Sequence, residues 1–486
     1  MRYTTPRTWL ALAGGVLITG AALGANGRGL QFSDFTPLAA SSGPAVDEAF
    51  PVLLSNDAFE QRSIADRASV LGEGIPNTGN WDMITTNETG RHRGRYLFTV
   101  FETGQSGIQR HDLKNGTTDT VWQTPYAAPD PRGAVAFDAS FWTPWGTFIT
   151  AEESWETNAN GSTSPYGRLF ELRNPIDAPG IRGALTPASN AGADLVHRNV
   201  VPRTSHEGIQ FDAEGAMYFI DELNGGSIYK YVPKAPFRQV LRGRADYFAA
   251  GQTFVLRVGD GATPNATGAY TWVPITDVNG NGLPGALVIT DVNGVRSVDA
   301  RNTTDLAAFK GTDYQRPEDL QIQRDGAREY LYVATTTTNE VYRLDLKKQT
   351  ISVFANRATI DLATGAAVGS GLTSPDNLAV DHAGNIYIVE DRNGGQDDDI
   401  WIARDLNQDG DLLDAGEGLG RWASNGTLGS EFTGLYFDPF HKRRAWVNIQ
   451  HPASGVDRTI QISIPWTREH GDDDRDDKDD DRDGKR

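Results

Sequence analysis

The alternation of apolar and polar residues follows one layout at three places in the chain. In 205–212, 315–320 and 374–381, a carboxylate stands two residues before the first aliphatic side chain of a strand-like run. Apolar residues at every second position are typical of a half-buried β-strand. The carboxylates that share this register are Glu207, Glu318 and Asp376.

Each of these strands is followed by a turn, a second alternating strand, another turn and a third strand. Gly, Asn and Asp occupy the turns, which is typical of antiparallel hairpins. The same pattern indicates further strands within 79–84, 95–102, 107–111, 137–154, 166–172, 254–258, 271–275, 432–438 and 444–452. Repetition of one meander predicts an all-β fold, a β-propeller, with six blades as the expected number and irregular insertions between 232 and 310.

The distribution of residue types divides the chain into four expected segments. Residues 1–25 place two arginines before an apolar stretch and small residues, as in a secretory signal peptide, whereas a membrane anchor needs a longer apolar run. Residues 26–70 read as a lead-in that packs on the domain outside the blades, and 71–467 as the propeller. The acidic, mixed-charge tail at 468–486 is expected to be disordered. We expect a periplasmic, secreted or cell-surface protein, exported without an adjacent arginine pair and therefore by the general route.

Composition narrows the possible partners and chemistries. The 486 residues carry a net charge of -19, which argues against binding to nucleic acid or to an anionic membrane. The chain has no cysteine, so disulfides, thiolate metal sites and thiol nucleophiles are excluded.

Metal sites are expected at the axis and in one loop. The innermost strand of each blade lines the channel, so Glu207, Glu318 and Asp376 should converge there, and cations with oxygen ligands would relieve their repulsion. A loop late in the chain has oxygen ligands at its first, third, fifth and seventh positions, like the start of an EF-hand, but Gly416 replaces the closing glutamate. Structural calcium and an acidic surface turn are both possible for this loop. Its four residues are Asp405, Asn407, Asp409 and Asp411.

Five motifs in order make the chain similar to the PhoX family of secreted, metal-dependent alkaline phosphatases. The motifs are Thr-Pro-Trp-Gly-Thr at 143–147 followed by Glu152 and Glu153, Ser-His-Glu-Gly at 205–208, Arg-Pro-Glu-Asp at 316–319, Ser-Pro-Asp-Asn at 374–377 and Asn-Ile-Gln-His-Pro at 448–452. The resemblance implies a six-bladed propeller that holds iron and calcium at its axis and hydrolyses phosphomonoesters. It assigns metal binding to Glu207, Glu318, Asp376, Glu152 and Glu153, catalysis to Arg316 and Glu318, and substrate binding to Arg316 and Asn377.

The residue chemistry is consistent with this implied function. A guanidinium binds two phosphate oxygens at once, while clustered cations polarise the ester and supply a metal-bound oxygen nucleophile. The family has a cysteine iron ligand shortly before the Thr-Pro-Trp-Gly-Thr motif, and here we align Asp138 with it as a metal ligand. Because a carboxylate is a harder ligand than a thiolate, calcium is expected rather than iron, although iron is not excluded.

Other interpretations of the same residues remain open. Neighbours in a strand face opposite sides, so only one of Glu152 and Glu153 should point at the axis, and the other could form a salt bridge. Arg316 could form a structural ion pair with Glu318 or Asp319. The small phosphate ester expected as substrate competes with two alternatives: a calcium-dependent propeller that hydrolyses another ester, as a lactonase does, and a non-catalytic binding propeller stabilised by metal.

Overall fold

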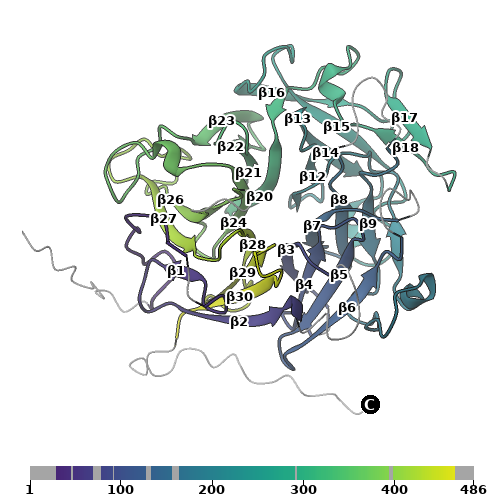
Figure 1. Cartoon of the computed structure of the whole chain (residues 1–486). Coiled ribbons are helices and arrows are strands. Elements are labelled where there is room, and N and C mark those ends of the chain that lie inside the picture. Colours follow the sequence, from purple (N-terminus) through teal and green to yellow (C-terminus); the bar gives the residue numbers. More distant parts are fainter. Residues whose placement is uncertain are drawn as a thin grey trace, which may run out of the picture.

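The computed structural model describes residues 29–44, 47–68, 78–90, 92–126, 133–155, 164–290, 293–392 and 398–465. Antiparallel sheets are arranged radially around one axis in Figure 1. The predicted all-β propeller is therefore confirmed. The expected signal peptide (1–25) and the expected disordered tail (468–486) lie outside the described residues.

The first two blades are four-stranded meanders that follow each other in the chain. In both, the first strand lies nearest the axis and each later strand pairs with the one before it. The first blade contains β3 (Trp81–Thr86), β4 (Tyr96–Phe101), β5 (Gly107–Asp112) and β6 (Thr117–Gln123). The second contains β7 (Phe137–Trp142), β8 (Phe148–Glu152), β9 (Leu169–Leu172) and β10 (Leu195–His197).

The third and fourth blades are joined at their outer edges. The third contains β11 (Ile209–Phe211), β12 (Met217–Ile220), β14 (Ile228–Pro233), β15 (Gly251–Val258) and β16 (Gly268–Pro274). The fourth contains β20 (Pro317–Asp325), β21 (Arg328–Thr335), β22 (Glu340–Asp345) and β23 (Thr350–Ala355). A short pairing of β16 with β23 makes the two blades one nine-stranded sheet.

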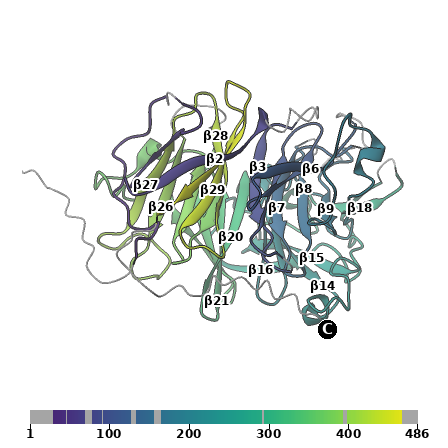
Figure 2. The ribbon, with the colours of Figure 1, turned by 90° about the horizontal axis from the view of Figure 1, so that it is seen from below.

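The fifth and sixth blades each take a strand from the beginning of the chain. The fifth contains β24 (Pro375–Val380), β25 (Ile386–Glu390), β26 (Asp399–Arg404), β27 (Gly418–Asn425) and β1 (Val52–Leu54). The sixth contains β28 (Glu431–Phe437), β29 (Arg444–Gln450), β30 (Arg458–Ser463) and β2 (Glu60–Asp66). β2 lies beside the C-terminal strands in Figures 1 and 2.

This pairing corrects the expectation that the 26–70 segment packs outside the blades. β1 pairs with β27, and β2 supplies the outer strand of the sixth blade. The C-terminal part of the chain provides only three strands for that blade, so its outer edge would have unpaired backbone groups without β2. The lead-in therefore belongs to the folded domain.

Irregular elements lie mainly between the third and fourth blades. Two small sheets pair β13 (Asn224–Gly226) with β19 (Tyr314–Gln315), and β17 (Leu287–Thr290) with β18 (Arg296–Asp299). The short helices are α2 (Phe237–Val240), η1 (Pro187–Asn190), η2 (Thr303–Asp305) and η3 (Gly369–Gly371). No helix of the described part of the chain is long and apolar enough to cross a membrane.

The innermost strands form a closed ring around the axis. Each of β3, β7, β11, β20, β24 and β28 contacts the next in this order, and β28 contacts β3 again. Residues at corresponding positions of these strands therefore face one another across the axis, although they are far apart in sequence.

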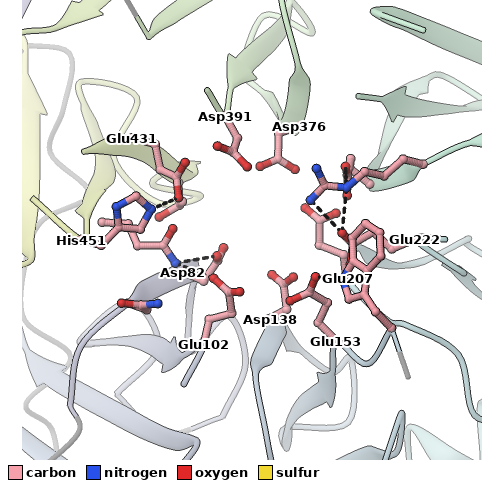
Figure 3. Close-up of a pocket in the computed structure, with 16 residues that line it drawn as sticks. Asp82, Glu102, Asp138, Glu153, Glu207, Glu222, Asp376, Asp391, Glu431 and His451 are labelled. Atoms are coloured by element: carbon pink, nitrogen blue, oxygen red, sulfur yellow. Dashed lines mark hydrogen bonds and ion pairs between the residues drawn. The ribbon is translucent and has the colours of Figure 1, made fainter. Parts of the chain in front are cut away.

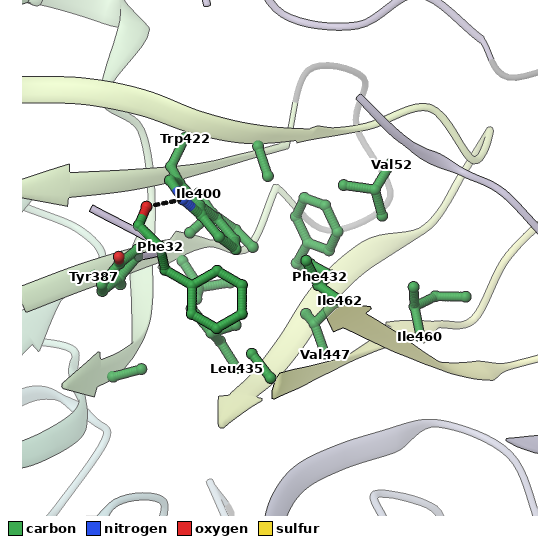
Figure 4. Packing of buried hydrophobic residues seen from close by; sticks show 14 of the residues in the cluster. Phe32, Val52, Tyr387, Ile400, Trp422, Phe432, Leu435, Val447, Ile460 and Ile462 are labelled. Carbon is green, nitrogen blue, oxygen red and sulfur yellow. Dashed lines mark hydrogen bonds between the residues drawn. The ribbon is translucent and has the colours of Figure 1, made fainter. Parts of the chain in front are cut away.

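The apolar core fills the spaces between neighbouring blades. Figure 4 shows the cluster between the fifth and sixth blades, where Phe32 from the lead-in lies among strand residues. The Phe32 ring lies 5.5 Å from that of Phe59, 5.9 Å from Trp422 and 5.4 Å from Phe437. Burial of apolar area at each contact between blades stabilises the ring, and the axis is left to polar side chains.

Candidate functional site

One cavity of ≈ 470 Å³ occupies the axis, and its walls are almost entirely polar (Figure 3). Ten carboxylates line it: Asp82, Glu102, Asp138, Glu153, Glu207, Glu222, Glu318, Asp376, Asp391 and Glu431. The other lining residues are Asn80, Trp155, Arg316, Thr433, Gln450 and His451. Arg316 is the single arginine or lysine among these described lining residues.

Five of the ten carboxylates lie at corresponding positions near the start of an inner strand, and a sixth, Glu431, is the first residue of β28. The inner-ring residues are Asp82, Asp138, Glu207, Glu318 and Asp376, and Thr433 lies at the corresponding place in the sixth blade. In five of these strands the pairing with the second strand shifts at this point, which is the signature of a β-bulge. A bulge turns a side chain away from the regular alternation, and here the carboxylate lies at the axis.

The backbone two residues before the inner-ring carboxylate is left-handed in four blades. The φ angles are 50° at Asn80, 39° at Ala136, 58° at Arg316 and 48° at Ser374. Such values are uncommon for residues other than glycine and often occur at functional sites. The repetition indicates that one local kink starts each bulge.

An outer ring comes from the residues that follow the second strand of a blade. Glu102 follows β4, Glu153 follows β8, Asp391 follows β25 and His451 follows β29, each by one position. Glu222 lies two positions after β12. Because second strands are antiparallel to inner strands, their ends lie beside the inner-ring carboxylates, as the neighbouring pairs in Figure 3 show.

Arg316 is held between carboxylates of two blades. Its Nη2 lies 3.0 Å from Glu222 Oε1, and its Nε lies 2.8 Å from Glu318 Oε1. Its guanidinium carbon lies 4.9 Å from the centre of the Trp155 ring. The proposed ion pair with Glu318 is therefore present, and Glu222 is an additional partner, whereas Asp319 instead accepts hydrogen bonds from the backbone N–H groups of Leu320 and Leu378.

Two groups of three carboxylates have the spacing needed for a shared cation. Asp138, Glu153 and Glu222 form one group, and Glu207, Glu318 and Asp376 form the other; within each group one oxygen per residue lies within 4.8 Å of the others. At that separation each ionised pair repels by roughly 3 kcal/mol, taking an effective dielectric constant of about 20.

The pKa values of these carboxyl groups also show that burial and mutual repulsion disfavour their ionised forms. Burial raises the pKa of Asp82 to about 8, and raises that of Glu318 to about 7 despite the opposing effect of Arg316. Burial, followed by the charge of neighbouring carboxylates, raises the pKa of Glu102, Asp138, Glu207, Glu222 and Asp376 well above the usual range. The carboxylates therefore cannot all be ionised near neutral pH unless metal cations neutralise them, and without cations some of them are protonated.

Several of these oxygens have no hydrogen-bond donor among the described residues. They are Asp82 Oδ1, Asp138 Oδ1, Glu207 Oε2 and Glu431 Oε2. Buried polar atoms without a partner are rare and point to an ion or water. Oxygen donors in this number fit calcium, which takes 6–8 oxygen ligands.

The structure separates the two glutamates that were both assigned to metal binding. Glu153 lines the cavity, whereas Glu152 is fully buried on the opposite side and accepts hydrogen bonds from Arg168 Nε (2.9 Å) and Nη2 (2.6 Å). The opposite orientation of strand neighbours explains this separation. Glu152 is therefore already neutralised by Arg168 and is not placed to bind an axial metal.

Asn377 is also not where the resemblance would place a substrate ligand. It is buried and does not line the cavity. Its Nδ2 donates to Glu207 Oε1 (3.0 Å), and its Oδ1 accepts from the Gly434 backbone N–H (2.6 Å). The assignment of Asn377 to substrate binding is not supported, and its contacts suit a residue that orients Glu207.

The side chains of the loop predicted as an EF-hand-like calcium site form hydrogen bonds within the loop. Asp405 Oδ2 accepts from the Gly410 backbone N–H (2.9 Å), and Asn407 Nδ2 donates to Asp409 Oδ2 (3.0 Å). Asp411 Oδ1 accepts from the backbone N–H of Leu413 (3.0 Å). Calcium binding by this loop stays a prediction.

Half of the acidic lining was not predicted from the sequence. Those residues are Asp82, Glu102, Glu222, Asp391 and Glu431. Asp82 stands two residues before Ile84, which is the register that identified Glu318, so the signal was present. For Glu102 and Asp391 the signal is a carboxylate immediately after a second strand, at the position of Glu153.

Comparison with known proteins places this geometry in a family. The model of the family described as alkaline phosphatase PhoX matches residues 139–453. Pseudomonas fluorescens PhoX in complex with vanadate, a transition state analogue, superposes with a TM-score of 0.57 at 14% identity, over 88% of this chain and 98% of that chain. A gluconolactonase from Xanthomonas campestris gives a TM-score of 0.40 at 12% identity, over 88% and 100% of the two chains. The comparison with curated proteins gave no significant match.

The matched region begins within β7 and ends beyond β29, and it includes the inner-ring carboxylates of the third to fifth blades. At 14% identity the Pseudomonas structure shows a shared fold. The family model spans well over half of the chain, and the protein is therefore a member of the alkaline phosphatase PhoX family.

Proposed function

We propose that the protein is a metal-dependent phosphomonoesterase that binds calcium at the propeller axis and the phosphate group at Arg316. The observation that carries the proposal is the position of one arginine inside a cavity lined by ten carboxylates. A site for cations and a guanidinium thus face the same space, as the binding of a phosphate dianion beside metal ions requires.

Calcium fits the residues better than iron does. The side chains that line the cavity offer carboxylate, amide and hydroxyl oxygens and one imidazole, and the chain contains no thiol. Carboxylate oxygens are the ligands that calcium prefers, whereas thiolates select softer metals. When bound, the cations would supply Lewis-acid activation of the phosphoryl group.

The residues of the chain divide the remaining tasks. Glu222 and Glu318 fix the orientation of the Arg316 guanidinium through Nη2 and Nε, so Nη1 and the second N–H of Nη2 are the donors for phosphate oxygens. Asn377 orients Glu207, and Gln450 Nε2 donates to Asp82 Oδ2 (3.1 Å) and Glu102 Oε2 (2.8 Å). Without cations the carboxylates would repel phosphate, so phosphate binding should depend on calcium.

The test replaces Arg316 and uses an arginine of the strand that follows it as control. Arg316→Gln should reduce phosphate release from phosphomonoesters at least 100-fold and should weaken inhibition by inorganic phosphate, because the bidentate partner of the phosphate is lost. Arg324→Gln, which changes an exposed arginine of β20, should retain full activity. Full activity of Arg316→Gln would reject the proposal, and hydrolysis of a neutral lactone that survives in this variant would identify the alternative esterase.

We further propose that the protein acts outside the cytoplasm. The support is the signal-like sequence of residues 1–25, together with membership in a family of exported phosphatases. N-terminal sequencing of the mature protein checks this, and recovery of a chain that still begins at residue 1 would contradict it.

A further inference from the structure

Trp155 differs from every other residue that lines the cavity. It is the one large apolar side chain among the described lining residues, and 41% of its surface is exposed. Exposed tryptophan is costly to leave in water and is common where proteins contact ligands. The other groups that line the cavity are charged or polar, and binding of metal or phosphate by them does not require an indole.

Two contacts of the Trp155 side chain and two of the preceding residue hold this position. Its indole N–H donates to Glu153, and its ring lies against the guanidinium of Arg316. The preceding residue, Ser154, donates its backbone N–H to Ser205 Oγ (2.9 Å), and its Oγ accepts from Arg301 Nη1 (3.2 Å). An exposed aromatic ring with this support keeps one orientation and provides a rigid surface for a ligand.

The position relative to Arg316 determines which part of a substrate meets the indole. The guanidinium carbon lies 4.9 Å from the centre of the Trp155 ring. A phosphate bound by Arg316 therefore brings the alcohol part of its ester close to Trp155. A planar ring in that alcohol could stack on the indole, whereas an aliphatic alcohol could not.

We propose that Trp155 is a specificity-determining residue, which selects phosphomonoesters whose alcohol carries a planar ring, with nucleoside monophosphates as the representative class. This inference rests on the proposed phosphatase function. It adds a preference that the metal site and Arg316 cannot produce, because both interact only with the phosphate group.

The test compares two esters in which the phosphate is bound to the same primary 5-oxygen of ribose. Adenosine 5′-monophosphate and ribose 5-phosphate differ by the planar base, so the ratio of their kcat/KM values measures its contribution. The wild-type protein should favour the nucleotide by about tenfold, in the range found for stacking on aromatic side chains. Trp155→Ala should reduce the ratio to about one, and Trp155→Phe should restore part of it. An unchanged ratio in Trp155→Ala would overturn the proposal.

Two controls separate stacking from a structural role. Trp272→Ala removes another tryptophan that has a cation over its ring, Lys230 at 5.9 Å, but lies outside the cavity, and it should leave the ratio unchanged. The inhibition constant of inorganic phosphate should be the same in wild type and Trp155→Ala. If that constant rises as much as the nucleotide preference falls, Trp155 acts through Arg316 and the proposal is wrong.

A binding experiment distinguishes failure of this inference from failure of the phosphatase proposal. Calorimetry with calcium compares phenylphosphonate and methylphosphonate, neither of which is hydrolysed. Tighter binding of phenylphosphonate that disappears in Trp155→Ala supports stacking even if no ester is turned over, in which case only the phosphatase function fails. Equal binding of the two phosphonates would overturn the role of Trp155 even in an active phosphatase.

Discussion

The neighbouring residues Glu152 and Glu153 should respond in opposite ways to the same substitution. Glu152→Gln removes the charge that neutralises Arg168, whose side chain is 5% exposed. Glu153→Gln removes one of several carboxylates that repel one another at the cavity. The first change should lower stability and leave calcium binding intact, and the second should weaken calcium binding and leave the metal-free fold intact.

The magnitude follows from the burial of the pair. Glu152 accepts from the Arg168 backbone N–H (2.8 Å), from two guanidinium nitrogens and from the Val135 backbone N–H (3.2 Å). Loss of one partner from a buried ion pair costs about 3–5 kcal/mol. The unfolding entropy for this chain length is roughly 1 kcal/mol/K, so Tm should fall by roughly 3–5 °C.

Thermal unfolding of both variants, with and without chelator, tests this prediction, and elemental analysis gives the calcium content. Glu152→Gln should keep the wild-type calcium content, and its Tm should be lower than that of the wild type both with and without metal. Glu153→Gln should keep the metal-free Tm and gain less stability from added calcium. A variant Glu152→Gln with normal Tm and reduced calcium would refute the reasoning and restore Glu152 as a metal ligand.

Three further predictions follow from the same structure. Phe32→Ala should lower the free energy of unfolding by about 3–5 kcal/mol in urea titrations, and a loss below about 1 kcal/mol would show that the lead-in does not pack as described. Asn377→Leu should weaken calcium binding by about tenfold through loss of the contact with Glu207, while phosphate inhibition at saturating calcium stays unchanged; unchanged calcium affinity would contradict that role. In the calcium-free protein, the free energy of unfolding should fall as the pH rises from roughly 4 to 8, because burial raises the pKa of Glu318 to about 7 and of Asp82 to about 8 while the unfolded chain ionises near pH 4. Urea titrations at several pH values check this, and a free energy that rises with pH would contradict it.

The propeller and part of its site could be predicted because both follow from local patterns. Alternation and turn residues marked the strands, and the offset between a carboxylate and the first aliphatic residue identified Glu207, Glu318 and Asp376. The opposite faces of a strand predicted that Glu152 and Glu153 would separate, although both were assigned to metal binding. The direction of that separation depended on Arg168, which immediately precedes β9 and pairs with Glu152.

Other features depend on contacts between distant parts of the chain. β2 completes the sixth blade although it lies nearly 400 residues before its partner β30 in the sequence. No local pattern specifies that pairing. Glu222 resembles an ordinary acidic residue after a strand, where carboxylates are common because they are solvated. Its burial at the axis is visible only once the ring is closed.

The closure of the ring and the arrangement of the site depend on the same residues. In the fourth and fifth blades, the bulge turns Glu318 and Asp376 to the axis, and the next residue bonds to the following blade: Asp319 Oδ2 accepts from the Leu378 backbone N–H (2.9 Å) and Asn377 Oδ1 from that of Gly434 (2.6 Å). In each of these blades, one residue thus faces the metal site and the next residue bonds to the neighbouring blade. Cations that neutralise the inner ring should therefore also stabilise the closed propeller, which is why calcium content and unfolding need to be measured together.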